Sequence, residues 1–225
     1  MPHTWLITGA SRGIGLELAR QAAARGDRVI AAVREPARHP GLAEICRSVV
    51  PFEATDDHSI AALGERLGGE RLDVLINNAG VAGGAKGIEG VSGPELARVL
   101  RVNSVAPVLV VKAVLPMLLE GERRLVVNIS SHLGSIGANA GGSSYSYRAS
   151  KAALNMLTAC MAIDLRERGV TCVAMHPGWV RTDMGGPKAP LLPAQAAADL
   201  LATFDRVVPA DSGRFMDRLG ETIPW

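Results

Sequence analysis

Short apolar runs, many of them β-branched, alternate along the chain with longer segments rich in alanine and leucine. Runs that are apolar at successive positions are typical of strands buried on both faces of a parallel sheet. They predict strands over 4–9, 28–33, 48–53, 72–77, 124–130 and 170–175. The longer segments predict helices over 14–25, 60–67, 95–119 and 149–168, with a further helix near Pro193.

This alternation predicts one α/β domain over residues 1–225, a doubly wound parallel β-sheet flanked by helices on both faces. Nearly half of the residues are apolar and a fifth are charged, as in compact globular proteins. The most apolar stretch, 99–119, is interrupted by Arg101, Asn103, Pro107, Lys112 and Pro116. It therefore predicts a core helix, with no membrane association.

Charge and the placement of cysteine and histidine exclude further classes of protein. A net charge of +2 with no basic run argues against a nucleic-acid partner. The three cysteines are odd in number and lack CxxC spacing, which indicates reduced thiols and a cytoplasmic protein. A strand pattern from residue 4 leaves no room for a signal peptide. The five histidines are scattered, so we expect no metal site.

The first strand is followed by "TGASRGIG", which has glycines at 9, 13 and 15. Glycine lets a backbone turn tightly against a pyrophosphate, and the next helix offers its N-terminal amides. An ordinary glycine turn is the alternative. Because the motif lies between the first strand and an amphipathic helix, it predicts dinucleotide binding at the carboxyl ends of the strands.

The second strand ends without the acidic residue that commonly binds the ribose of NAD. Val33 stands there and Arg34 follows, and a guanidinium suits the 2′-phosphate of NADPH. Arg12, in the glycine motif, is within reach of the same phosphate. In the alternative, Glu35 binds the ribose of NAD and Arg34 is solvated.

Polar or glycine motifs also follow the later strands. Glu53, with Ala54 beside it, is a candidate contact for adenine or else part of a solvated turn. The pair Asn77 and Asn78 ends the fourth strand and needs hydrogen-bond partners, which the loops around a cofactor would provide. Ser130 and Ser131 follow the fifth strand, and "HPGWVRTDM" (176–184) follows the sixth.

Together these motifs resemble the short-chain dehydrogenase/reductase family over essentially the full length of the chain. The resemblance rests on "TGASRGIG", "NNAG", Asn103 in "VNS", "NISS", "YRASK" and "HPGWVRTDM". Within the family, "ISSHLGSIG" and the ending "GRFMDRLGETIPW" resemble sniffer-type carbonyl reductases and C-factor proteins. The resemblance implies a single-domain Rossmann fold.

The resemblance implies a catalytic tetrad of Asn103, Ser131, Tyr147 and Lys151. Tyr147 and Lys151 are four positions apart and share a helix face, whereas Tyr145 does not. We therefore expect Tyr147 to be the general acid, with a pKa lowered by the nearby lysine ammonium. Ser131 fits the family's catalytic serine, and Ser130 is expected to end the strand.

Two features of the tetrad carry further expectations. Asn103 would kink its helix and seat a water that relays protons to Lys151. The stretch from Ser131 to Tyr147 is a few residues longer than in most family members, and "GANAGGSS" holds the insertion.

By resemblance and motif, the cofactor site comprises Gly9, Ser11, Arg12, Gly13, Ile14, Gly15, Arg34, Glu53, Ala54, Asn78, Ala79, Gly80, Tyr147, Lys151, Pro177, Gly178, Val180 and Thr182. The implied activity is hydride transfer between NADPH/NADP and a small ketone, aldehyde or quinone, because the segment between Thr182 and Pro193 is too short for a large lid. The alternatives are a C-factor-type signalling protein and an NAD-dependent alcohol dehydrogenase. We expect a homodimer or homotetramer through the helix that contains 152–163, with a monomer as the alternative.

Overall fold

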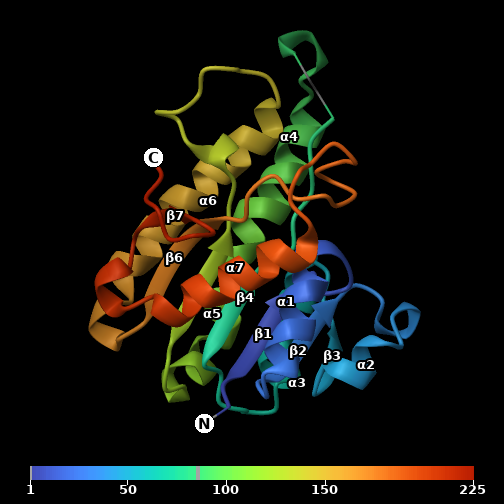
Figure 1. Cartoon of the computed structure of the whole chain (residues 1–225), viewed down its shortest axis with the longest axis vertical. Coiled ribbons are helices and arrows are strands. Elements are labelled where there is room, and N and C mark those ends of the chain that lie inside the picture. Colours follow the sequence, from blue (N-terminus) through green and yellow to red (C-terminus); the bar gives the residue numbers. More distant parts are fainter. Residues whose placement is uncertain (1, 85–86) are drawn as a thin grey trace.

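A central parallel sheet organises the computed structural model, which describes residues 2–84 and 87–225 (Figure 1). Within these residues seven strands lie in the order β3-β2-β1-β4-β5-β6-β7, and every neighbouring pair is parallel. The strands are β1 (Thr4–Thr8), β2 (Arg28–Val33), β3 (Ser48–Pro51), β4 (Val74–Asn77), β5 (Leu125–Ile129), β6 (Thr171–His176) and β7 (Phe215–Asp217). The strand order reverses between β1 and β4, which is where ligands bind in open α/β sheets.

Helices cover both faces of this sheet. They are α1 (Gly13–Ala24), α2 (Leu42–Ile45), α3 (Asp57–Arg66), α4 (Gly93–Leu100), α5 (Ala106–Glu120), α6 (Tyr145–Asp164) and α7 (Pro193–Arg206). One apolar cluster joins α1 and α7 to one face, and a second joins α3, α5 and α6 to the other. Parallel strands need crossover connections of this kind, and the helices bury both faces.

The six predicted strands are confirmed, and β7 is the one that the hydrophobic pattern did not reveal. Its three residues, Phe215–Asp217, are too few to show a periodicity. The helix predicted over 95–119 is confirmed as the continuous stretch Gly93–Glu120, in which a π-helical turn, Arg101–Val105, lies between α4 and α5. The helix predicted from 149 begins earlier, at Tyr145.

The α4–α5 stretch, Gly93–Glu120, is long and apolar enough to cross a membrane by length and composition alone. Half of its most apolar window is buried inside the protein. Val110, Val111, Val114 and Leu118 face the sheet and are almost completely buried. This helix therefore packs as a core helix, as its interrupting polar residues predicted.

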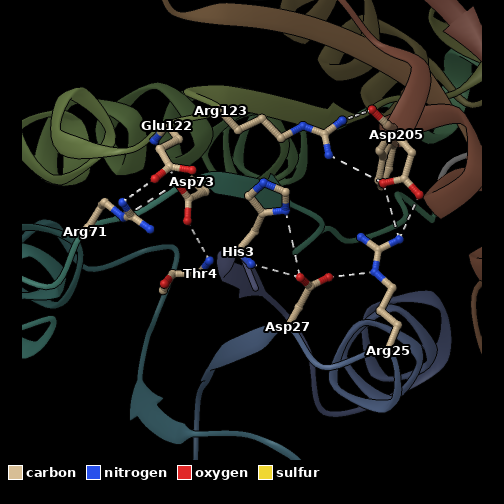
Figure 2. Close-up of polar contacts among 10 residues, drawn as sticks. His3, Thr4, Arg25, Asp27, Arg71, Asp73, Glu122, Arg123 and Asp205 are labelled. Atoms are coloured by element: carbon tan, nitrogen blue, oxygen red, sulfur yellow. Dashed lines mark hydrogen bonds and ion pairs between the residues drawn. The ribbon is translucent and has the colours of Figure 1, made fainter. Parts of the chain in front are cut away.

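A charged network ties together the edge of the sheet where the strands begin (Figure 2). Asp73 is completely buried, and its carboxylate accepts hydrogen bonds from the backbone N–H groups of Thr4 and Glu122, both at 2.8 Å. Nearby, Arg25 at the end of α1 pairs with Asp27 at 2.6 Å and with Asp205 of α7 at 3.0 Å. These contacts fix the ends of helices from both faces, away from the ligand-binding edge.

Candidate active site

A large cavity lies at the carboxyl ends of the strands and has a volume of about 1050 Å³. At the β2 side it is lined by Arg34, and at the β5 side by Ser131, Tyr147 and Lys151. Gly9, Ser11, Arg12, Gly13 and Ile14 of the glycine-rich loop also line it, whereas the predicted Gly15 does not. The strand order therefore places the predicted nucleotide and catalytic motifs around one continuous space.

The glycine-rich loop after β1 is held by hydrogen bonds from the segment after β4. Thr8 Oγ1 accepts from the backbone N–H groups of Asn78 and Ala79, both at 3.1 Å. The Asn78 side chain donates to the carbonyls of Thr8 and Gly9 at 3.0 and 3.1 Å. Asn78 thus contacts a loop of the cavity, as expected. Asn77 does not, because its amide turns inward and donates to Asn128 Oδ1 at 2.9 Å.

The same loop fits the pyrophosphate of a dinucleotide. Gly9 has φ of 68°, and a side chain there would lie 2.9 Å from the Ala79 backbone. Among the described residues no side chain caps α1, and its first turn contains no acidic residue. No acidic side chain from the first turn of α1 therefore competes with an anion for the N-terminal amides and the helix dipole.

Three charged side chains lie near the β2 side of this cavity. Arg34 lines it and is exposed, and within residues 2–84 and 87–225 its guanidinium makes no hydrogen bond or ion pair. Glu35, by contrast, pairs with Arg38 at 3.2 Å and does not line the cavity. Arg12 lines the cavity but pairs with Asp183 at 2.5 Å, on the opposite wall. A free guanidinium at Arg34 suits a phosphate better than a ribose hydroxyl.

Glu53 and Ala54, the candidate adenine contacts, line the cavity after β3. The Glu53 carboxylate accepts from both the backbone N–H and the hydroxyl of Thr55, at 2.9 and 2.8 Å. The Glu53 side chain is thus held in a local turn, and its contact with adenine stays a prediction.

Ser131, Tyr147 and Lys151 lie together at the β5 side of the cavity. Ser131 directly follows the strand end, and the other two occupy the first turns of α6. The Ser131 hydroxyl lies near the Tyr147 phenol, where it favours the phenolate form. Lys151 Nζ lies 5.8 Å from the centre of the Tyr147 ring and donates to the Ile129 carbonyl at 2.7 Å. Tyr145 is 42% exposed and does not line the cavity, in accordance with helical spacing.

Burial dominates the pKa values of these groups. It raises the pKa of Tyr147, and the smaller opposing effect of the hydrogen bond from Ser131 does not offset it. It lowers the pKa of Lys151 from 10.5 to about 8. The expectation that the lysine lowers the pKa of Tyr147 is therefore wrong for this arrangement, because desolvation of the phenolate outweighs an ammonium that does not touch it.

Asn103 lies in the π-helical turn, which is the interruption that the sequence predicted there. Its amide oxygen accepts from the Val81 backbone N–H at 2.8 Å, and its nitrogen donates to the Val81 carbonyl and Ser150 Oγ, both at 2.9 Å. Asn103 thus joins the segment after β4 to α6 and does not itself line the cavity. The water relay to Lys151 stays a prediction.

Asn155 is a positioning residue that the sequence interpretation missed. Its side chain accepts from Ser130 Oγ at 2.6 Å and donates to the Gly134 carbonyl at 3.3 Å, on either side of Ser131. An asparagine one helical turn beyond Lys151 is unfavourable in a helix interior without a tertiary partner. This unfavourable position in the helix could have identified Asn155 from the sequence.

The loop after β6 closes the cavity from the other side. Pro177, Gly178, Val180 and Thr182 all line it, where the resemblance placed the nicotinamide. His176 also lines it, and burial lowers its pKa to about 4, so its ring is neutral at pH 7. Its ring centre lies 6.0 Å from that of His132. Within the described residues no group of three or more His, Cys, Asp or Glu could hold a metal ion.

Comparison with known proteins agrees with this arrangement. A model of the short chain dehydrogenase family matches residues 3–190, and the chain belongs to this family of oxidoreductases. Among its relatives is the C-signal protein of Myxococcus xanthus, 45% identical over 154 residues that cover 68% of this chain and 93% of the relative.

Solved structures of carbonyl reductases share the whole fold. An NADPH-bound carbonyl reductase from chicken fatty liver superposes with a TM-score of 0.92 at 37% identity, covering 100% of this chain and 99% of its own. The carbonyl reductase Sniffer of D. melanogaster gives a TM-score of 0.93 at 30% identity, with both chains fully covered. The resemblance to sniffer-type and C-factor proteins is thereby confirmed.

Proposed function

We propose that the protein is an NADPH-dependent carbonyl reductase of small ketones, aldehydes or quinones. One observation supports this most strongly: a single cavity is lined at one side by Arg34, which has no partner among the described residues, and at the other by Ser131, Tyr147 and Lys151. The similarity to carbonyl reductases, one of them NADPH-bound, points the same way.

The chain's own residues have distinct roles in this proposal, and bound NADPH would supply the hydride. Ser131 and Tyr147 line the same side of the cavity, so one carbonyl oxygen bound there could accept a hydrogen bond from each hydroxyl. Burial raises the pKa of Tyr147 and so keeps its phenol protonated, ready to donate to the oxygen as negative charge develops there. Lys151, a buried ammonium fixed by the Ile129 carbonyl, then stabilises the phenolate.

The substrate range follows from the loop after β6. Only a short segment separates Thr182 from the start of α7 at Pro193, and no additional helix covers the cavity in this described segment. We therefore propose a permissive site and, with three cysteines that form no disulfide, a cytosolic enzyme. Tight selectivity for one bulky substrate in a steady-state screen would argue against this assignment.

Cofactor preference is tested by fluorescence titration with NADPH and NADH. Because the 2′-phosphate would pair with Arg34, we expect NADPH to bind at least tenfold more tightly, a difference of about 1.4 kcal/mol. Arg34→Ala should remove most of this preference and leave NADH affinity unchanged. Equal binding of the two cofactors by the parent protein would contradict the assignment of NADPH.

The catalytic role is tested by Tyr147→Phe, with Tyr145→Phe as the matched control. Loss of the general acid should lower the turnover of ketones by about 10²–10⁴-fold and leave NADPH binding intact. The control should retain the parent rate, because Tyr145 lies outside the cavity. If the parent protein bound NADPH but reduced none of a broad carbonyl panel, the signalling alternative would be favoured.

We also propose that two or more copies associate through α6. Met156 and Ile163 are large apolar side chains that are more than 60% exposed on this helix. Exposed apolar side chains on one element favour contact with a second protein surface. Analytical ultracentrifugation of the parent and Met156→Glu proteins distinguishes this assembly from a monomer.

A further inference from the structure

Residues 135–138 follow the turn that carries Ser131, and a segment distant in sequence holds them. Ser135 is almost completely buried, and its hydroxyl donates to the Pro224 carbonyl at 2.6 Å. The Gly137 backbone N–H donates to the Trp225 carbonyl at 2.8 Å. Ser135 Oγ also accepts from the Ala138 N–H at 3.0 Å, which closes the turn. These backbone carbonyls therefore fix the course of the chain just beyond the catalytic serine.

Helix α6 holds the same stretch from the opposite side. Gly134 packs so closely on α6 that a side chain there would lie 2.8 Å from the Lys151 backbone carbon. Asn155 donates to the Gly134 carbonyl, as described above. The segment 134–138 is thus clamped between the catalytic helix on one side and residues 224–225 on the other.

Residues 223–225 are in turn anchored on β7. The Ile223 N–H donates to the Phe215 carbonyl at 2.9 Å, and the Ile223 side chain is buried beside Phe215. The Trp225 ring stacks on the Phe215 ring, with centres 5.7 Å apart and an angle of 24° between planes. Because β7 pairs with β6, this anchor is continuous with the rigid sheet.

Between residue 138 and α6 short-range contacts hold the chain: the Gly142 N–H donates to Asn139 Oδ1 at 3.1 Å, and Arg148 of α6 donates to the Gly142 carbonyl at 2.7 Å. Ser143 and Ser144 both adopt left-handed conformations, with φ of 60° and 48°, which cost roughly 1–2 kcal/mol per residue for non-glycine residues. Such a conformation persists only where the surroundings enforce it. Leu133 and Ser144, at the two ends of this connection, line the cavity. The positions of Leu133 and Ser144 in the cavity therefore depend on how the connection between them is held.

We propose that residues 224 and 225 are positioning residues of the substrate site. Through Ser135 and Gly137 they hold the connection between Ser131 and Tyr147. They thereby set the positions of Leu133 and Ser144 in the cavity, and so which carbonyl substrates fit there. This inference rests on the proposed carbonyl reductase activity. Residues 224 and 225 would thus control the width of the substrate site without lining the cavity themselves.

Ser135→Ala tests the inference, because it removes the hydroxyl that links Pro224 to the turn. The matched control is Ser212→Ala, which removes a hydroxyl that accepts from the Cys172 N–H at 3.1 Å, at the far end of β6. Kinetics are measured with acetone-sized and aryl ketones at saturating NADPH. The measured quantity is kcat/KM for the aryl ketone divided by kcat/KM for the small ketone. We expect this ratio to rise at least fivefold in Ser135→Ala, mainly through KM, and to stay unchanged in Ser212→Ala. NADPH affinity should stay within twofold.

A second pair of variants keeps the inference testable if Ser135→Ala does not fold. Trp225→Ala removes the stack on Phe215 and should shift the same ratio in the same direction, whereas Trp225→Phe should restore the parent ratio. An unchanged ratio in a folded Ser135→Ala or Trp225→Ala protein, or an equal shift in Ser212→Ala, would overturn the clamp and leave the reductase proposal intact. Absence of any carbonyl turnover by the parent protein would instead overturn the proposed function, and the clamp with it.

Discussion

At the scale of single residues, Lys151 shows a conflict between stability and chemistry. Its ammonium is buried beside Tyr147 with one hydrogen bond, to the Ile129 carbonyl. Burial disfavours the charged form and lowers the pKa of Lys151 to about 8. The site therefore holds a cation that destabilises the fold at neutral pH, which is typical of residues selected for activity.

The pKa of Lys151 predicts how stability depends on pH. Because the folded pKa of about 8 lies below the unfolded value of 10.5, the unfolded chain binds more protons between these pH values. The free energy of unfolding should therefore rise as the pH increases from about 8 to 10.5. Below pH 8 the buried ammonium destabilises the fold to its full extent. Lys151→Met should raise that free energy by roughly 1–3 kcal/mol at pH 7 and by much less at pH 10.

Urea denaturation of both proteins at the two pH values measures this effect, with ketone turnover as the second readout. Turnover by Lys151→Met should fall sharply, since the ammonium beside Tyr147 is lost. Equal stability of the two proteins at pH 7 would contradict the proposed burial penalty.

At the scale of elements, α6 packs against the turn after β5 and so positions the residues of the proposed catalytic site. That turn, His132–Gly134, packs on α6 at Gly134, where there is no space for a methyl group. Because the contact is this close, neither the turn nor α6 can shift toward the other. The distance between Ser131 and Tyr147 therefore depends on Gly134, which has no side chain to push the turn away from α6.

Gly134→Ala should force the turn away from α6. Overpacking of this kind destabilises by about 1–3 kcal/mol, and we expect kcat to fall more than NADPH affinity. Gly93→Ala is the matched control, because an added methyl group at the start of α4 meets nothing within 4 Å. Thermal unfolding and steady-state kinetics measure both effects. A parent-like kcat in Gly134→Ala would show that this close approach does not set the geometry.

At the scale of the whole molecule, the two edges of the sheet serve different purposes. The carboxyl edge carries the cavity, and the amino edge carries the charged network of Figure 2. Asp73 and Asp205 belong to that network, but their surroundings differ. Asp73 is fully buried and accepts two backbone hydrogen bonds, whereas the Asp205 side chain is 50% exposed.

This difference predicts unequal costs for the same substitution. Asp73→Ala leaves the buried Thr4 N–H and the partly buried Glu122 N–H without their acceptor and should lower the free energy of unfolding by roughly 2–4 kcal/mol. Asp205→Ala removes solvent-exposed ion pairs and should cost no more than about 1 kcal/mol. Denaturant titrations in low and high salt measure both, and only the Asp205 effect should weaken with salt. If both variants lost the same free energy of unfolding, the buried hydrogen bonds of Asp73 would not be the main stabilising contacts of this network.

Most of the fold and of the candidate site followed from local sequence pattern. Strands apolar on both faces predicted six of the seven strands, and helical spacing separated Tyr147 from Tyr145. The pattern did not reveal β7, because three residues carry too little periodicity. It also missed Asn155, whose partners Ser130 and Gly134 are about 20 or more positions away in the chain.

The sequence by itself determined the class of fold, the family and the identity of the chemical groups. These depend on residue types and short spacings, which local physical rules relate directly to strands, helices and glycine turns. Only the tertiary structure decided that Asn77 faces the interior, that burial raises the pKa of Tyr147, and that residues 224–225 hold the turn beyond Ser131. Desolvation and long-range hydrogen bonds arise from elements brought together by packing, so no local pattern records them.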